Sequence, residues 1–168
     1  MNYPVNFLAI ILSALIPLLI RFIWFNPKVF GKAWMRASDL TDEKANSANM
    51  MLIIGFSLFF NFLIAFVLAT IVVHQTGVLA LFAGEPDLDN PNSPAAQELA
   101  NLMKVHGDKF RSFGHGALHG TITGLFFVMP IISTNALCER RGFNYIAIYS
   151  GYWIVSLALM GGLICAWH

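Results

Sequence analysis

Residues Met50–Val73 have the sequence MMLIIGFSLFFNFLIAFVLATIVV, a run without a single charged side chain. An α-helix needs about 20 apolar residues to cross about 30 Å of hydrocarbon. The run shows none of the alternation between polar and apolar residues that a strand of a membrane barrel requires. It therefore predicts a transmembrane helix.

Three further stretches have the same apolar character. Together with this run they predict four spans, at about residues 4–25, 50–74, 113–137 and 145–167. The whole chain of 168 residues is 57% hydrophobic and only 11% charged, whereas soluble domains are about 45–50% apolar and about 25% charged. Backbone groups in lipid must be satisfied within their own segment, which favours helices. The expected fold class is all-α: a polytopic membrane protein, with residues 1–168 forming one bundle of four transmembrane helices.

Charge and cysteine content exclude other classes of protein. A net charge of +1 provides no basic face for nucleic acid. Two cysteines are too few for a disulfide scaffold. The expected partners are the lipid bilayer and, beyond it, a second copy of the chain or a larger membrane complex.

The loops predict the orientation of the spans. The loops after spans one and three lie on one side and carry Lys28, Lys32, Arg36, Lys44, Arg140 and Arg141. The opposite side, with both termini, carries Lys104, Lys109 and Arg111. Lysine and arginine are concentrated in cytoplasmic loops. We therefore expect a bacterial cytoplasmic (inner) membrane protein with both termini outward.

Two connecting segments are expected to contain short helices. Basic residues alternate with apolar ones over Lys28–Ala37, which predicts an interfacial helix on anionic headgroups; a partner-docking element is the alternative. Its headgroup-facing residues would be Lys28, Lys32, Trp34 and Arg36. In the long outer loop, residues 83–112, Ser93 and Pro94 are typical of a helix start and Gly107 of a stop. This amphipathic helix is expected to rest on the membrane or to cap the bundle.

Small residues recur at four-residue spacing in three of the spans. These packing positions are Gly116, Gly120 and Gly124 in span three, Ser57, Asn61, Ala65 and Ala69 in span two, and Gly151 in span four. Small residues let helix backbones approach closely in lipid. They predict an intramolecular bundle, and the alternative is a strip left free for a homo-oligomer. Pro17 and Pro130 fall within spans and predict kinks.

The strongest candidate for chemistry is the pair His115 and His119, which lie four residues apart at the outer end of span three. Residues at this spacing share one face of a helix, so both imidazoles can bind one transition-metal ion. His74 and His106 are further candidate ligands on the same side, with Glu85, Asp87, Glu98 or Asp108 as a candidate carboxylate. Two alternatives remain open, namely proton or substrate handling and a purely structural role.

Two motif regions resemble a known family. They are Trp24–Trp34, with the sequence WFNPKVFGKAW, and the C-terminal region with Thr134–Leu137, Glu139–Arg141, Gly151–Trp153 and Ser156–Gly161. Both are similar to segments of the small bacterial membrane proteins called domain of unknown function 1761. The resemblance implies a four-helix membrane protein and assigns no activity or functional residue.

The sequence supports three hypotheses for function. The first is a non-enzymatic module that self-associates or serves as an accessory subunit. The second is a metal- or cofactor-binding membrane protein, redox or transport related, built on His115 and His119. The third is an oligomeric pore lined by Ser57, Asn61 and Thr123. Because the sequence contains no Ser-His-acid constellation, glycine-rich phosphate loop or pair of intramembrane carboxylates, it favours a role other than catalysis and assigns no catalytic residue.

Overall fold

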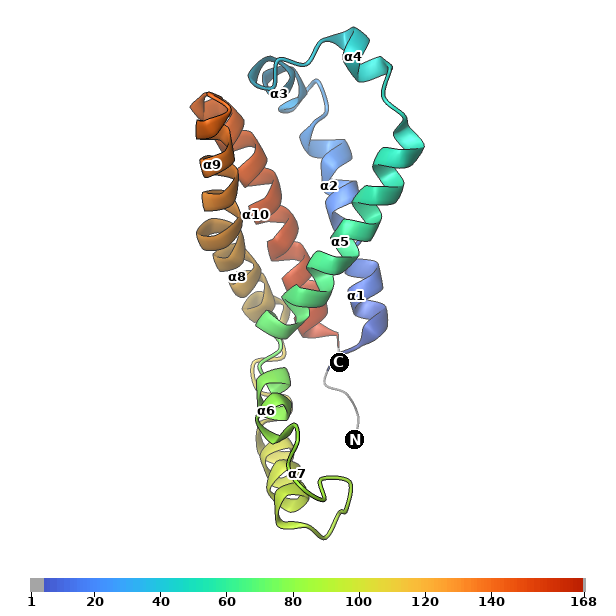
Figure 1. The fold of residues 1–168 in the computed structure, drawn as a ribbon, viewed down its shortest axis with the longest axis vertical. Coiled ribbons are helices and arrows are strands. Elements are labelled where there is room, and N and C mark those ends of the chain that lie inside the picture. Colours follow the sequence, from blue (N-terminus) through green and yellow to red (C-terminus); the bar gives the residue numbers. More distant parts are fainter. Residues whose placement is uncertain (1–4, 168) are drawn as a thin grey trace.

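The computed structural model describes residues 5–167, and every regular element in that range is helical. Four helical segments are long and apolar enough to cross a membrane, so the expected all-α, four-span architecture is confirmed. The spans are built from α1 with α2, from α5, from α8, η1 and α9, and from α10 (Figure 1). In chain order the elements are α1 Phe7–Ser13, α2 Ile16–Trp24, α3 Gly31–Ala37, α4 Asp42–Asn46, α5 Met50–Val72, α6 Gln75–Phe82, α7 Pro94–His106, α8 Phe113–Thr123, the π-helical η1 Gly124–Val128, α9 Met129–Cys138 and α10 Phe143–Ala166.

The observed ends of the spans differ little from the predicted ones. The predicted start of the first span, at residue 4, lies outside the described residues, and within them α1 begins at Phe7. Span two ends at Val72 rather than at residue 74, because Val73 is extended and His74 belongs to the turn before α6. The other two spans agree closely with Phe113–Cys138 and Phe143–Ala166.

The two ends of the bundle have different contents. We call the end with residues 26–49 and 139–142 the basic end, and the end with residues 73–112 the histidine end. Both basic loops lie together at the basic end, while α1 begins and α10 finishes at the histidine end (Figure 1). This is the relative arrangement that the loop charges predict.

Helix α10 is the centre of the bundle. Of its most apolar stretch 56% is buried, against 11–28% for the other three spans. It packs against α8 and also against α1, α2 and α5. Large apolar side chains on the outer faces are exposed instead, as at Met51 (83%), Phe126 (76%) and Leu137 (69%). Apolar surface of this extent is what a bilayer would cover.

Pro17 breaks the first span, as predicted. The chain leaves α1 after Ser13 and resumes helix at Ile16, with Pro17 as the second residue of α2. Proline has no N–H to donate, and its ring excludes the carbonyl of the residue four positions earlier, here Ser13. The Pro17 carbonyl accepts a hydrogen bond of 3.0 Å from the Tyr152 hydroxyl, which ties the break to α10.

Pro130 produces a different irregularity. It is the second residue of α9, the helix that directly follows η1. A π-helical turn holds an extra residue, so the chain passes the proline ring while α8 and α9 remain parts of one span. The expected kink therefore takes the form of a π-bulge.

The glycines of α8 lie directly against α10. A Cβ built on Gly120 would fall 2.0 Å from the Leu157 carbonyl oxygen, and one built on Gly116 would fall 2.1 Å from that of Gly161. Side chains do not approach backbone atoms so closely, so only hydrogen fits at these two positions. The strip is occupied within the chain, which is the intramolecular arrangement that the spacing predicts.

Gly124 and Gly151 make room for side chains of neighbouring helices. Gly124 lies against Ile154, and Gly151 lies under the indole ring of Trp24. The Trp24 indole N–H donates a hydrogen bond of 3.1 Å to the Ile148 carbonyl. These contacts hold α2 and η1 against α10.

Helix α5 packs only along its C-terminal half. Asn61, Ala65 and Ala69 of the predicted strip are buried there, and Ser57 is half-buried. Toward its start, α5 leans away from the other spans (Figure 1), and residues 50–60 are exposed apart from Ser57. Half of this span therefore has lipid, or another chain, as its expected neighbour.

Helix α3 begins at Gly31, later than the predicted start at Lys28, because residues 27–30 form turns. Asn26 organises them: its side-chain oxygen accepts from the Lys28 N–H and its carbonyl from the Gly31 N–H, both at 2.9 Å. Lys28 therefore belongs to the turns, whereas Lys32, Trp34 and Arg36 lie on α3.

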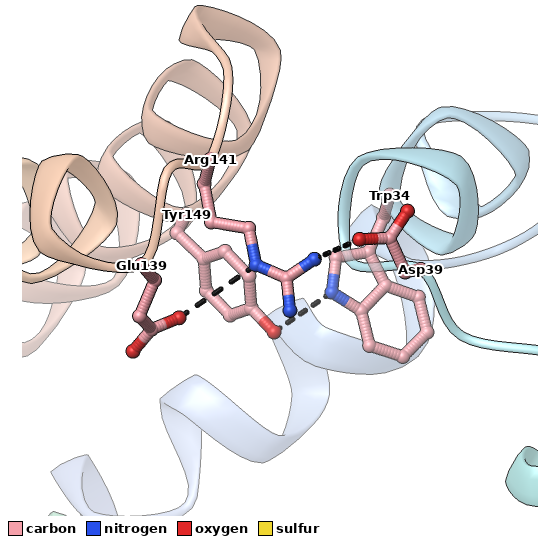
Figure 2. Close-up of polar contacts among 5 residues, drawn as sticks. All are labelled: Trp34, Asp39, Glu139, Arg141 and Tyr149. Atoms are coloured by element: carbon pink, nitrogen blue, oxygen red, sulfur yellow. Dashed lines mark hydrogen bonds and ion pairs between the residues drawn. The ribbon is translucent and has the colours of Figure 1, made fainter.

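Polar contacts link α3 and Asp39, just after it, to α10 and to the loop that precedes α10 (Figure 2). The Trp34 indole N–H donates a hydrogen bond of 2.8 Å to the Tyr149 hydroxyl. Arg141 forms an ion pair with Asp39 and lies 3.7 Å from the carboxylate of Glu139. These contacts hold α3 across the ends of the spans, the position expected of an interfacial helix.

Helices α6 and α7 pack against each other and project beyond the four spans at the histidine end (Figure 1). Helix α7 begins as predicted, with the Ser93 hydroxyl accepting from the Ala96 N–H at 3.2 Å and Pro94 as its first residue. It ends before Gly107, and Leu99 on its apolar face is buried. Because α7 uses this face against α6, it does not cap the four spans.

Candidate metal centre

Three histidine side chains meet at the histidine end. His74, at the junction of α5 and α6, lies beside His115 and His119 of α8, and one ligand nitrogen from each lies within 4.8 Å of the others. The Nε2 atoms of His74 and His115 are 2.9 Å apart. The three ring centroids are 4.5–5.0 Å apart. His115 and His119 are neighbours because of their spacing on one helix, whereas His74 is brought to them by the fold.

The start of α8 positions His115 and His119. The Ser112 hydroxyl caps the helix by accepting a hydrogen bond of 3.3 Å from the His115 N–H. The four-residue spacing then puts both rings on one face. Gly116 and Gly120 lie in the same two turns and contact the backbone of α10 directly. The part of α8 that carries both histidines is therefore packed against α10.

His74 is positioned by the break between α5 and α6. The helix stops at Val72, and the turn that follows carries His74. The next residue, Gln75, is buried, and its side-chain amide donates hydrogen bonds of 2.9 Å to the carbonyls of His106 and Lys109. This amide holds the segment after α7 beside the start of α6, close to where α8 begins.

Phe110 and Cys165 complete the surroundings. The Phe110 ring stacks on His115 with centroids 4.9 Å apart, and its centroid lies 6.1 Å from that of His74. The buried Cys165 thiol contacts the carbonyl oxygens of Phe110 (3.3 Å) and Val72 (3.4 Å), one in each segment that leads to a histidine. The sequence gives no signal for either role, because both depend on contacts between distant segments.

The donors of this centre are imidazole nitrogens. In the hydrogen bond between His74 and His115 one ring must accept, so at least one of these imidazoles is neutral.

Arg111, just before α8, donates a hydrogen bond of 3.2 Å to the Trp167 carbonyl and so links the segment that precedes α8 to the end of α10. Burial lowers the pKa of Arg111, while Cys165 and Asp108 act in the opposite direction.

His106 does not join the three histidines. It is the exposed last residue of α7 and lines, with His74, a mostly apolar cavity of about 280 Å³ beside the centre. Within residues 5–167 the cluster that could hold a metal includes no carboxylate, so the fold does not bring Glu85, Asp87, Glu98 or Asp108 into it.

The residues expected to line a pore lie apart from this centre and offer little free polar surface. Asn61 is buried among the helices. The Thr123 hydroxyl donates a hydrogen bond of 2.8 Å to the His119 carbonyl within α8. Ser57 is half-buried on α5.

Comparison with known proteins identifies a family for this chain. No curated protein and no solved structure matches the chain. The family model DUF1761, described as a protein of unknown function, matches residues 8–165. The match includes the three clustered histidines and both basic loops. The chain therefore belongs to the DUF1761 family, whose function is unknown.

Proposed function

We propose that this four-helix membrane protein binds one transition-metal ion through His74, His115 and His119. The observation that carries the proposal is the convergence of three imidazole nitrogens within 4.8 Å. Such a set suits Zn²⁺, and also copper or nickel. Two of the ligands are held at fixed spacing by one helix, and the third arrives from a junction between helices.

Binding requires the three rings to adjust, since their ligand nitrogens lie within 4.8 Å of one another rather than at the spacing of a tetrahedral site. Two nitrogens bound to a tetrahedral Zn²⁺ at about 2.0–2.1 Å lie roughly 3.4 Å apart, whereas those of His74 and His115 are 2.9 Å apart. The two rings must separate by a few tenths of an ångström as the ion replaces the shared proton. His74 is exposed and the other two are half-buried, so His74 is the ligand with most freedom to move.

The donor set leaves room for an exchangeable ligand. Three imidazoles bind a zinc ion and leave its fourth position to water or another ligand, and the cluster contains only histidines within the described residues. Its place at the end of a span lets an ion arrive from the aqueous phase. The role supported best is metal-ion binding at the membrane surface in the service of transport or redox chemistry.

Metal uptake by the purified protein tests this proposal. Protein stripped with a chelator and then dialysed against Zn²⁺ or Co²⁺ is expected to retain one ion per chain. Bound Co²⁺ should give the visible absorption of a tetrahedral nitrogen site. If the protein retains no ion above the detergent blank, the three histidines have a structural role and the proposal fails.

A second candidate function is self-association or service as an accessory subunit. It is favoured by the exposed first half of α5 and by an apolar cavity of about 410 Å³ between α5, η1 and α10, lined by Val67, Phe127 and Trp153 among others. The α8 glycines are already covered by α10, so a second copy would contact α5 instead. Light scattering of the solubilised protein would reveal more than one copy, and a stable monomer would argue against self-association.

We also propose that the histidine end faces outward and the basic end faces the cytoplasm of a bacterial inner membrane. In a Cys138→Ser background we expect Asn101→Cys in α7 to react with an impermeant maleimide in spheroplasts. Asn46→Cys in α4 should react only after lysis, and both positions are exposed. The native Cys165 is buried and should stay unlabelled. The reverse labelling pattern would overturn this orientation.

A further inference from the structure

A cavity of about 570 Å³ lies at the basic end, at the other end of the bundle from the three histidines. It is formed by α3 on one side and by the α9–α10 loop with the first turn of α10 on the other. Arg36, Arg140 and Arg141 line it, together with one acid, Asp39. The lining therefore carries three positive charges and one negative charge.

The single acid is already engaged. Asp39 pairs with Arg141 (Figure 2), and the Arg141 guanidinium also lies beside the Tyr145 ring. Within residues 5–167 the side chains of Arg36 and Arg140 form no ion pair or hydrogen bond. Two guanidinium groups without counter-ions therefore face one cavity, and like charges so placed favour binding of an anion.

Two helix ends create this arrangement. Helices α3 and α9 both close with the residue after the cap in the left-handed region, at Asp39 (φ 51°) and Arg140 (φ 57°). Glycine is the usual residue there, and another residue is strained by about 1–2 kcal/mol. The Leu40 N–H bonds to the Met35 carbonyl at 2.9 Å, and the Arg141 N–H bonds to the Ala136 carbonyl at 2.8 Å, the Schellman pattern.

The start of α10 adds to the positive potential. Gly142 precedes the helix and has no side chain that could cap it. The first-turn N–H groups of Phe143 and Asn144, which lie beside the cavity, therefore have no side-chain acceptor from the cap residue. Such N–H groups and the helix dipole favour an anion at this position. Phe143 is 78% exposed, so an apolar surface adjoins the cationic one.

The geometry points to a phosphate-binding site for the headgroup of an anionic phospholipid. Arginine guanidiniums bind phosphate oxygens through charge-assisted hydrogen bonds. The cavity lies at the ends of the spans, beside the Trp34–Tyr149 contact, where lipid phosphates are expected. Arg36 and Arg140 would hold the phosphate, and acyl chains would extend along the exposed Phe143.

Lipid titration of the solubilised protein tests the site. Short-chain phosphatidylglycerol, short-chain phosphatidylcholine and inorganic phosphate are titrated separately, and binding is followed by native mass spectrometry and thermal stability. We expect phosphatidylglycerol to bind at least about tenfold more tightly than phosphatidylcholine. Arg36→Gln with Arg140→Gln should weaken it at least about tenfold. Binding of inorganic phosphate with the same dependence on both arginines would support a phosphate site and overturn the lipid as its source.

The matched control is Lys44→Gln with Lys104→Gln, which removes the same charge from exposed positions outside the cavity lining. This variant should bind phosphatidylglycerol within about twofold of wild type. Equal weakening by both double variants would mean diffuse attraction and would overturn the site. Arg140→Gly separates the effect on folding from the effect on binding. Glycine relieves the strain of the positive φ at this position, so the thermal stability of the protein should rise, while phosphatidylglycerol should still bind more weakly. Unchanged binding in this stabilised variant would also overturn the site.

Discussion

Replacing Gly120 by alanine is expected to destabilise the bundle by about 2–3 kcal/mol, the upper range for overpacking a well-packed interface. The added Cβ would fall 2.0 Å from the Leu157 carbonyl oxygen and 2.6 Å from its carbonyl carbon. These are backbone atoms of a neighbouring helix, so no side-chain rotation relieves the clash. Helices α8 and α10 must separate, and the histidine pair on α8 moves with them. Thermal unfolding of the detergent-solubilised protein measures the loss.

Gly114 provides the control within the same helix. No atom lies within 4 Å of a Cβ built there, so Gly114→Ala should be neutral or should stabilise the helix by up to about 1 kcal/mol. The comparison isolates the close approach from helix propensity, because both substitutions add the same methyl group to α8. Equal stability of the two variants would show that α8 does not lie against α10 as described.

Replacing His115 by alanine is expected to weaken metal binding at least about 100-fold, because a three-ligand site becomes a two-ligand one. The same loss is expected for His74→Ala and for His119→Ala, since the three nitrogens form one group. Competition with a chromophoric chelator measures the affinity. Of the three variants, His74→Ala carries the most information, because its requirement follows from the fold alone.

His106→Ala is the control for the metal variants, since His106 lies on the same side and outside the cluster. It should bind metal with wild-type affinity. Stability without metal serves as a second readout: a structural histidine cluster would lose stability in all three variants whether or not metal is added. If His106→Ala lowers the affinity as much as His115→Ala does, the ligand set proposed for the centre is wrong.

The two proposed sites lie at opposite ends of the bundle and rest on different chemistry. The metal site consists of imidazole nitrogens from a helix junction and from α8, whereas the arginines are charged groups near two strained helix ends. The first uses the α5–α6 junction and α8, and the second uses α3, the α9–α10 loop and the start of α10, so they share no residue. Failure of one proposal would therefore leave the other standing.

The family and the spans could be predicted from the sequence because each depends on local composition or motif. The helix start at Ser93 is likewise local, since its side-chain oxygen caps an N–H three residues away. The pairing of His115 with His119 follows from helical spacing. His74 was one of two further candidates, and nothing in its neighbourhood distinguishes it from His106.

What the sequence alone determined is which segments prefer lipid and which residues share a face of one helix, because these properties are set within a few turns of chain. Only the tertiary structure decided that His74 completes the cluster, that Gly120 contacts Leu157, and that α3 places Arg36 opposite Arg140. Each of these contacts joins residues from separate helices. Their distance depends on how helices cross, which no local pattern specifies.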